Sequence, residues 1–215
     1  MISGGKVKER PILFTGAMVR ALLDGSKTQT RRVLRDQGPV DLGVFTHGSH
    51  LSRRPVKERG NVIGHRLASV TCPYGQPGGA LWVREAFRVA EGYKNLSPNG
   101  VRALTAGISI HYEANGAAPA TVGRLRPSIH MPRAWSRITL EITAVRVERL
   151  NQISLSDVRA EGCEVRAFWT FGADEVGRQR IGANVYRSLW ESINGPGSWG
   201  LNPWVWVVSF RRNTP

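Results

Sequence analysis

Four neighbouring residues in the first part of the chain could carry out chemistry. Lys27, Thr30, Arg31 and Arg32 lie within six positions of one another, just after a short apolar segment. An amine beside a hydroxyl can activate that hydroxyl as a nucleophile when burial or nearby cations make the neutral amine accessible. Arg31 and Arg32 are such cations. The alternative is a solvated basic turn, which is the commoner meaning of a short basic string.

The alternation of side chains along a strand decides whether Lys27 and Thr30 can meet. Successive side chains of an extended segment point to opposite faces, so Thr30 and Arg32 share one face while Arg31 lies on the other. Lys27 is three residues from Thr30 and therefore has the wrong parity. Their contact requires the turn at residues 24–27 to bend the lysine back.

Three segments carry the signals of helices. Residues 17–23 stop at an Asp-Gly pair, residues 154–162 begin with a capping box and end at a glycine, and residues 176–193 precede Asn-Gly-Pro-Gly. The apolar stripe predicted for the third helix consists of Ile181, Val185, Leu189 and Ile193.

Glu161 lies at the C-terminal end of the second predicted helix. The negative end of the helix dipole raises the energy of an ionised carboxylate there. Such a position suits a group that holds a proton. The alternative is an exposed surface glutamate.

The strand signals predict one mixed α+β domain covering residues 1–215. Alternating or continuous apolar patterns indicate strands at 11–14, 28–33, 80–89, 108–113, 136–150 and 204–211. Residues 36–79 are rich in Gly, Pro, His and Arg and lack a clear period, so we expect a loop insertion there. The basic run at 53–59 within it is a candidate contact for phosphates.

Histidine and cysteine placement does not predict a metal site. His47, His50, His65 and Cys72 include one His-x-x-His pair, but their spacing fits no established zinc site. Two cysteines, Cys72 and Cys163, are too few for a disulfide framework, so we expect small inert thiols in a reducing compartment.

Three further residues are candidates for contact with a substrate. Arg84 and Glu85 face opposite ways on the 80–89 strand, and Glu85 lies among apolar residues, which favours a buried ion pair over a site residue. His130 lies between two prolines in a stiff loop that could present its ring, although a lone histidine is more often structural.

The charge balance predicts a polyanionic partner. The chain has 30 basic and 16 acidic side chains, a net charge of +14, which attracts nucleic acid. Coding bias is the alternative, because 25 of the 30 are arginine. No apolar run approaches the roughly 20 residues of a membrane span, and the N-terminus lacks the apolar core of a secretory signal. We therefore expect a cytoplasmic protein without a membrane partner.

The motif Gly25-x-Lys27-x-x-Thr30-x-Arg32 resembles the signature of the activating-signal-cointegrator homology (ASCH) family. Segments 81–85, 127–132, 137–150, 153–157 and 204–208 are similar to its longer, phage- and prophage-associated branch. The sequence departs from the family pattern at two places. It has Gly79-Ala80 where relatives commonly have Gly-Asp, and Ala134-Trp135 where the family frequently has Trp before Ala.

The resemblance implies a PUA-like mixed β-barrel of about five or six strands, with flanking helices and loop insertions. Several members are amidohydrolases that act on N4-acylated cytosine nucleosides through a lysine, a threonine and a glutamate, without a cofactor. The matching positions are Lys27, Thr30 and Glu161, with Lys27 accepting the Thr30 proton and Glu161 protonating the leaving amine. Candidate contacts to the nucleoside or nucleic acid are Ser26, Arg31, Arg32, Arg84, Glu85 and His130.

A second function is compatible with the same residues. PUA-like barrels also bind nucleic acids without catalysis, holding a base and phosphates in a basic cleft. The alternative is therefore a non-catalytic RNA- or DNA-binding module, with RNA favoured over DNA.

Overall fold

The computed structural model describes residues 8–35, 37, 40–46, 49–58, 61–97, 99–100, 108–165 and 172–213, and for residues 40–70 only the backbone. The described residues fall into two compact units. The first unit takes residues from Met1–Ser26, Gly79–Glu141 and Arg211–Pro215, and the second from Lys27–Gly78 and Ile142–Phe210.

The first unit is built on a parallel strand pair. Strand β1 (Glu9–Leu13) pairs with β6 (Ala80–Arg84), and β6 pairs antiparallel with the first residues of β9 (Thr139–Arg149). Helix α1 (Gly16–Leu23) follows β1 and buries Val19 and Leu22. A two-stranded sheet, β7 (Phe87–Val89) with β8 (Ile110–Tyr112), has its own apolar cluster. The predicted 80–89 strand is thus two strands, interrupted at residues 85–86.

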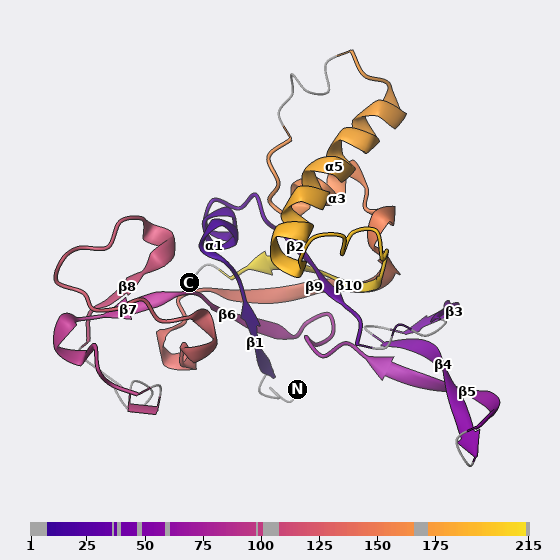
Figure 1. Ribbon diagram of the computed structural model, residues 1–215, viewed down its shortest axis with the longest axis horizontal. Coiled ribbons are helices and arrows are strands. Elements are labelled where there is room, and N and C mark those ends of the chain that lie inside the picture. The colour runs from indigo at the N-terminus through magenta and orange to yellow at the C-terminus, as the bar shows by residue number, and fades with distance from the viewer. Residues whose placement is uncertain are drawn as a thin grey trace, which may run out of the picture. The chain divides into compact units, whose positions relative to one another are not determined.

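The second unit contains the remainder of β9, then β10 (Trp204–Arg212) and β2 (Gln29–Val33), in that order across the sheet. Helices α3 (Leu155–Ala160) and α5 (Glu175–Asn194) pack on one face of this part of the sheet (Figure 1). The shared core consists of Leu150, Ile153, Val158, Tyr186, Trp190, Val205 and Val207.

Helix α5 buries a different stripe from the one predicted. Its buried residues are Gly182, Tyr186 and Trp190, each one position after a predicted core residue, while Ile193 is 45% exposed. A spacing of four drifts around the helix by about 40° per step, so neighbouring rows compete for the core. The aromatic row faces the core because it contacts Val205 and Val207 of β10.

Strands also occupy much of the predicted loop insertion. β3 (Val40–Thr46), β4 (Ser49–Glu58) and β5 (Asn61–Thr71) form a three-stranded antiparallel sheet, so the expectation of an irregular loop is wrong for these residues. The side chains of the basic run at 53–59 lie outside the described residues.

The fold is mixed α+β. Because β9 takes part in both units, the main sheet has five strands in the order β1-β6-β9-β10-β2. Within the described ranges no pairing closes these strands into a ring, so the PUA-like barrel stays a prediction. None of the described helices is long and apolar enough to span a membrane. Short 3₁₀ helices occur at Glu91–Tyr93, Glu113–Asn115, Ser128–His130, Arg133–Trp135 and Leu150–Gln152.

Candidate functional site

Strand β2 directs alternate side chains to opposite faces of the second unit. Arg31 lies opposite Val207 of β10, and Gln29 lies opposite Ser209. Val207 belongs to the core beneath α3 and α5, so the odd-numbered face of β2 is directed toward these helices. Gln29 Nε2 donates to Ser209 Oγ at 3.3 Å on this face. Lys27, four residues before Arg31, has the same parity.

Lys27 meets Glu161 on this face. Lys27 Nζ lies 2.8 Å from Glu161 Oε2 and also donates to the Glu161 backbone oxygen at 2.8 Å. The two residues form an antiparallel bridge, and Thr28 N donates to Ala160 O at 2.8 Å beside it. The side chains of Lys27 and Glu161 are 0% and 2% exposed. The pair is therefore held by main chain as well as by charge, away from solvent.

The end of α3 places Glu161 in this position. A capping box at Ser154 and Asp157 starts the helix, and Glu161 is its C-cap residue. Gly162 follows with φ 81°, a left-handed conformation that glycine adopts without steric cost and that ends the helix. The carboxylate at the helix end is paired with Lys27 rather than exposed, which compensates for the unfavourable dipole.

Arg31 links the pair to two more carboxylates. Its guanidinium contacts Glu161 Oε1 at 3.3 Å, Asp157 Oδ2 at 3.0 Å and, through Nε, Glu148 Oε1 at 3.1 Å. Arg146 in turn contacts Glu148 at 3.0 Å and Asp157 at 2.9 Å. We call these six residues the charge cluster: Lys27, Arg31, Arg146, Glu148, Asp157 and Glu161. Its three cations and three carboxylates balance, which reduces the cost of burial.

Burial and charge act together on the protonation of this region. Burial favours the neutral form of Arg31, but the Glu148 and Glu161 carboxylates outweigh it and raise the pKa of the guanidinium. Burial would likewise raise the pKa of Asp157, but Arg31, Ser154 and Arg146 lower it to about 2. Both groups are therefore charged at neutral pH.

Two neighbours of the cluster are held in their neutral forms. Tyr186 OH donates to Glu161 Oε1 at 3.4 Å, and burial, followed by the Glu161 charge, raises the pKa of Tyr186 well above its usual value. Burial and then Glu161 raise the pKa of the Cys163 thiol to about 11, although Lys27 acts in the opposite direction. Neither group supplies an ionised nucleophile at neutral pH.

Thr30 lies on the other face of β2. It is opposite Val208 in the register with β10 and is 2% exposed. Among the described residues Thr30 has no hydrogen bond to Lys27, so the expected transfer of its proton to that amine has no geometric basis here. The physical reason is strand parity, which the turn before β2 does not reverse. Arg32 shares the Thr30 face, opposite Trp206.

The remaining predicted residues belong to the first unit. Glu85 is 1% exposed and accepts from Arg137 Nε and Nη2 at 2.8 and 2.9 Å, which makes it a buried ion pair. Arg84 lies over the Trp82 ring at 5.4 Å. Ser26 is exposed, and its hydroxyl donates to Ala21 O at 3.3 Å. His130 is half-buried at the end of a 3₁₀ helix. Glu85, Arg84 and Ser26 thus make side-chain contacts within this unit.

Sequence reasoning missed Glu148, Arg146 and Tyr186 as members or neighbours of this site. One available signal was the parity shared by Lys27 and Arg31, which predicts a common partner for the two cations. Another was Glu148, a carboxylate that lies between Val147 and Arg149 and two residues after Arg146, within reach of more than one cation.

No group of three or more metal-ligating side chains occurs among the described residues. His47 and the side chains of His50 and His65 lie outside them. No protein-family model, curated protein or solved structure matches the chain. The class that the described structure defines is a mixed α+β protein with a buried, charge-balanced Lys-Glu-Arg site.

Proposed function

We propose that the chain is an amidohydrolase that removes an acyl group from the N4 amine of a modified cytosine nucleoside or nucleotide. One observation carries the proposal. The family resemblance singles out Lys27 and Glu161, which are 134 residues apart in the sequence, and their charged atoms lie 2.8 Å apart in the structure. A lysine and a glutamate in contact can move protons in opposite directions during the cleavage of an amide.

The geometry changes the roles expected from the sequence. In the proposed reaction Glu161 accepts a proton from water as the water oxygen attacks the acyl carbon. Lys27 stabilises the oxyanion and transfers a proton to the departing N4 nitrogen, so the products are a carboxylic acid and the free amine. Arg31 is a positioning residue, because Glu148 and Asp157 anchor it against Glu161. Thr30 takes no part in proton transfer.

Burial sets a condition on this mechanism. Because the Lys27 and Glu161 side chains are almost completely covered, substrate must enter by displacing part of that cover. The bound substrate excludes bulk water, apart from the attacking water molecule, and this strengthens the electrostatic interactions of the pair.

The test is the release of cytidine from N4-acetylcytidine without added metal. Lys27→Arg keeps the positive charge but cannot release a proton at neutral pH, so it should abolish turnover, as should Glu161→Gln. Thr30→Val removes the hydroxyl at constant shape and should keep the activity. Glu141→Gln is the matched control, because Glu141 pairs with Arg211 in the first unit.

Each variant is first checked by thermal denaturation, so that a lost activity is not a lost fold. Full activity in folded Lys27→Arg would exclude Lys27 as the proton donor. Loss of activity in folded Thr30→Val would restore the hydroxyl as nucleophile. No hydrolysis by the wild type across a panel of acyl groups would exclude the enzyme.

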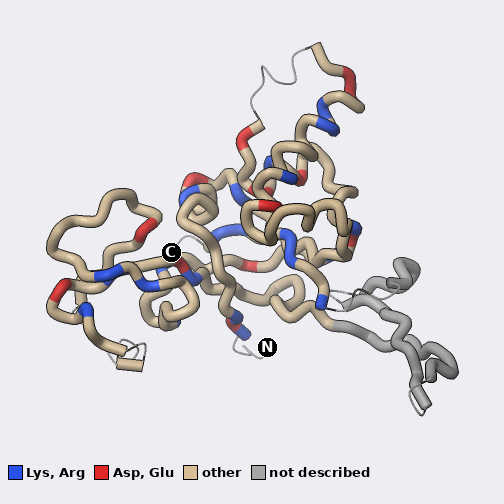
Figure 2. Tube along the Cα trace, in the orientation of Figure 1, with Lys and Arg blue, Asp and Glu red and all other residues tan. Residues whose placement is uncertain are grey.

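The net charge of +14 favours a second candidate, RNA binding. The charge cluster is balanced, so this excess is carried by residues outside it, and Lys and Arg occur in both units (Figure 2). Binding to mixed-sequence RNA should weaken by about 10³-fold or more between roughly 50 and 200 mM salt. Lys27→Arg should leave this binding unchanged. Salt-independent binding would count against the second candidate.

A further inference from the structure

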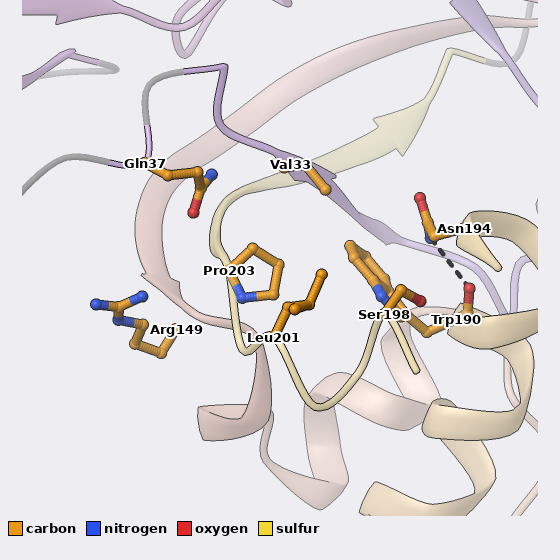
Figure 3. Close-up of a pocket in the computed structure, with 8 residues that line it drawn as sticks. All are labelled: Val33, Gln37, Arg149, Trp190, Asn194, Ser198, Leu201 and Pro203. Carbon is orange, nitrogen blue, oxygen red and sulfur yellow. Dashed lines mark hydrogen bonds between the residues drawn. The ribbon is translucent and has the colours of Figure 1, made fainter. Parts of the chain in front are cut away.

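The second unit contains a pocket that the charge cluster does not use. Its volume is about 530 Å³, within the range of small-ligand sites. It lies between the end of β2, the last turns of α5 and the loop before β10 (Figure 3). Its lining includes Val33, Arg149, Trp190, Ser198, Leu201 and Pro203.

The pocket and the charge cluster share one face of the sheet. Val33 follows Arg31 by two residues on β2, so the two side chains have the same parity. Trp190 follows Tyr186 by about one turn of α5, and their ring centroids are 6.2 Å apart. The pocket therefore neighbours the charge cluster without including any of its six charged residues.

Two polar groups of the pocket residues have unused hydrogen-bonding capacity. Trp190 Nε1 and Ser198 Oγ are buried and have no hydrogen-bond partner among the described residues. Figure 3 shows the indole nitrogen on the side facing Ser198. The indole N–H can only donate, and the hydroxyl can donate as well. Because an unpaired buried donor is costly, this end of the pocket is suited to a ligand acceptor.

Gln37 also lines the pocket, but its side-chain oxygen and nitrogen already make hydrogen bonds within the protein. Its side chain accepts from Trp204 N at 2.8 Å and donates to Leu34 O at 2.6 Å. It closes the wall of the pocket by linking the end of β2 to β10.

The opposite end of the pocket is cationic. Arg149 Nη1 donates to Asn202 O at 3.1 Å, and the guanidinium lies 4.2 Å from the centroid of the Trp204 ring. These contacts hold the side chain, and within the described part of the chain Arg149 has no carboxylate partner. Pro203 and Leu201 lie between Arg149 and Trp190 (Figure 3), and Leu201 is 78% exposed. An apolar surface thus separates a cation from two hydrogen-bond donors.

We propose that this pocket binds an unpaired nucleotide. The base lies against Val33, Leu201 and Pro203 with an edge acceptor directed to Trp190 and Ser198, and the phosphate lies at Arg149. A planar ring with an edge acceptor and an anion at its other end is the chemistry of a nucleoside monophosphate. The inference goes beyond the proposed hydrolysis, because no step of that reaction uses these residues.

The experiment is calorimetric titration of the full chain with cytidine 5′-monophosphate and, separately, with cytidine. Trp190→Phe removes the indole N–H together with one of the two fused rings, so it should weaken binding of both by about 3- to 10-fold. Arg149→Gln, with Arg149→Lys as the variant that keeps the charge, should remove the preference for the phosphorylated compound. Arg211→Gln, an equal change of charge in the first unit, should leave both affinities within about twofold.

The fold of each variant is checked by its melting temperature. Trp190→Phe should lower it, because the smaller ring leaves a cavity in the core, so its affinity is measured at a temperature at which it is fully folded. Absence of binding at millimolar cytidine 5′-monophosphate would overturn the inference, as would wild-type affinity in both Trp190→Phe and Arg149→Gln. If pentacytidylate competes with the mononucleotide, the pocket binds the terminal nucleotide of a strand. If pentacytidylate does not compete, the pocket binds the free nucleotide.

Discussion

Removing the negative charge of Glu161 should destabilise the protein strongly. In Glu161→Gln, Lys27 loses a carboxylate at 2.8 Å while its side chain remains 0% exposed. Breaking a buried ion pair from one side costs about 3 to 5 kcal/mol, because the remaining charge is left uncompensated. Arg31 keeps Glu148 and Asp157, so most of the loss falls on Lys27. The free energy of unfolding of a typical protein is about 5 to 15 kcal/mol, so this loss is a large fraction of the total stability.

Urea denaturation followed by tryptophan fluorescence measures the effect, with Glu141→Gln as control. The side chains of the Glu141 and Arg211 pair are 34% and 69% exposed, so the control should cost only about 0 to 1 kcal/mol. Adding Lys27→Met to Glu161→Gln should recover part of the loss, with a coupling energy of about 1 to 3 kcal/mol. If Glu161→Gln costs no more than Glu141→Gln, or if the two changes are additive, the reasoning about burial is wrong.

Three other measurements test the site and its surroundings. The pKa of Asp157 is lowered from 3.8 to about 2, so its ionised form contributes about 1 to 2 kcal/mol to the free energy of unfolding. This contribution is present above pH 4 and is lost as the pH falls toward 2. Urea midpoints measured over this range should therefore fall less steeply in Asp157→Asn than in the wild type. Cys163, whose pKa is raised to about 11, should react slowly with iodoacetamide at pH 8 and faster toward pH 11, and rapid labelling at pH 8 would contradict that raised pKa. Asp174 accepts from Gly177 N at 2.7 Å as the N-cap of α5, so Asp174→Ala should cost about 1 kcal/mol in thermal denaturation, whereas an unchanged melting temperature would show that the cap is unimportant.

Local signals in the sequence predicted the elements around the site closely. The capping box at Ser154 and the glycine at 162 gave the limits of α3, and the Asp-Gly pair at 24–25 gave the end of α1. These signals are reliable because they act within a few residues, through side-chain hydrogen bonds and backbone conformation. The alternation of side chains along β2 is equally local and was therefore predictable. It places Thr30 and Lys27 on opposite faces of the strand.

Segments without a period were harder to predict. Residues 40–46, 49–58 and 61–71 form strands although the composition favoured a loop, because pairing between β3, β4 and β5 supplies hydrogen bonds that no single segment shows. The core face of α5 was displaced by one residue for a related reason. The predicted row is the more aliphatic one, but Tyr186 and Trp190 of the neighbouring row pack in the core cluster with Val205 and Val207 of β10.

The sequence by itself determined the ends of the helices, the alternation along β2 and the candidacy of Lys27 and Glu161, since each depends on local spacing or on a motif. Only the tertiary structure decided the partners. It brought Glu148 of β9 and Asp157 of α3 to Arg31, balanced the charges of the cluster, and left Trp190 and Ser198 unpaired beside a pocket. These outcomes depend on how strands and helices that are distant in the chain pack together. That packing, and not spacing along the sequence, sets side-chain hydrogen bonding and charge compensation in the interior.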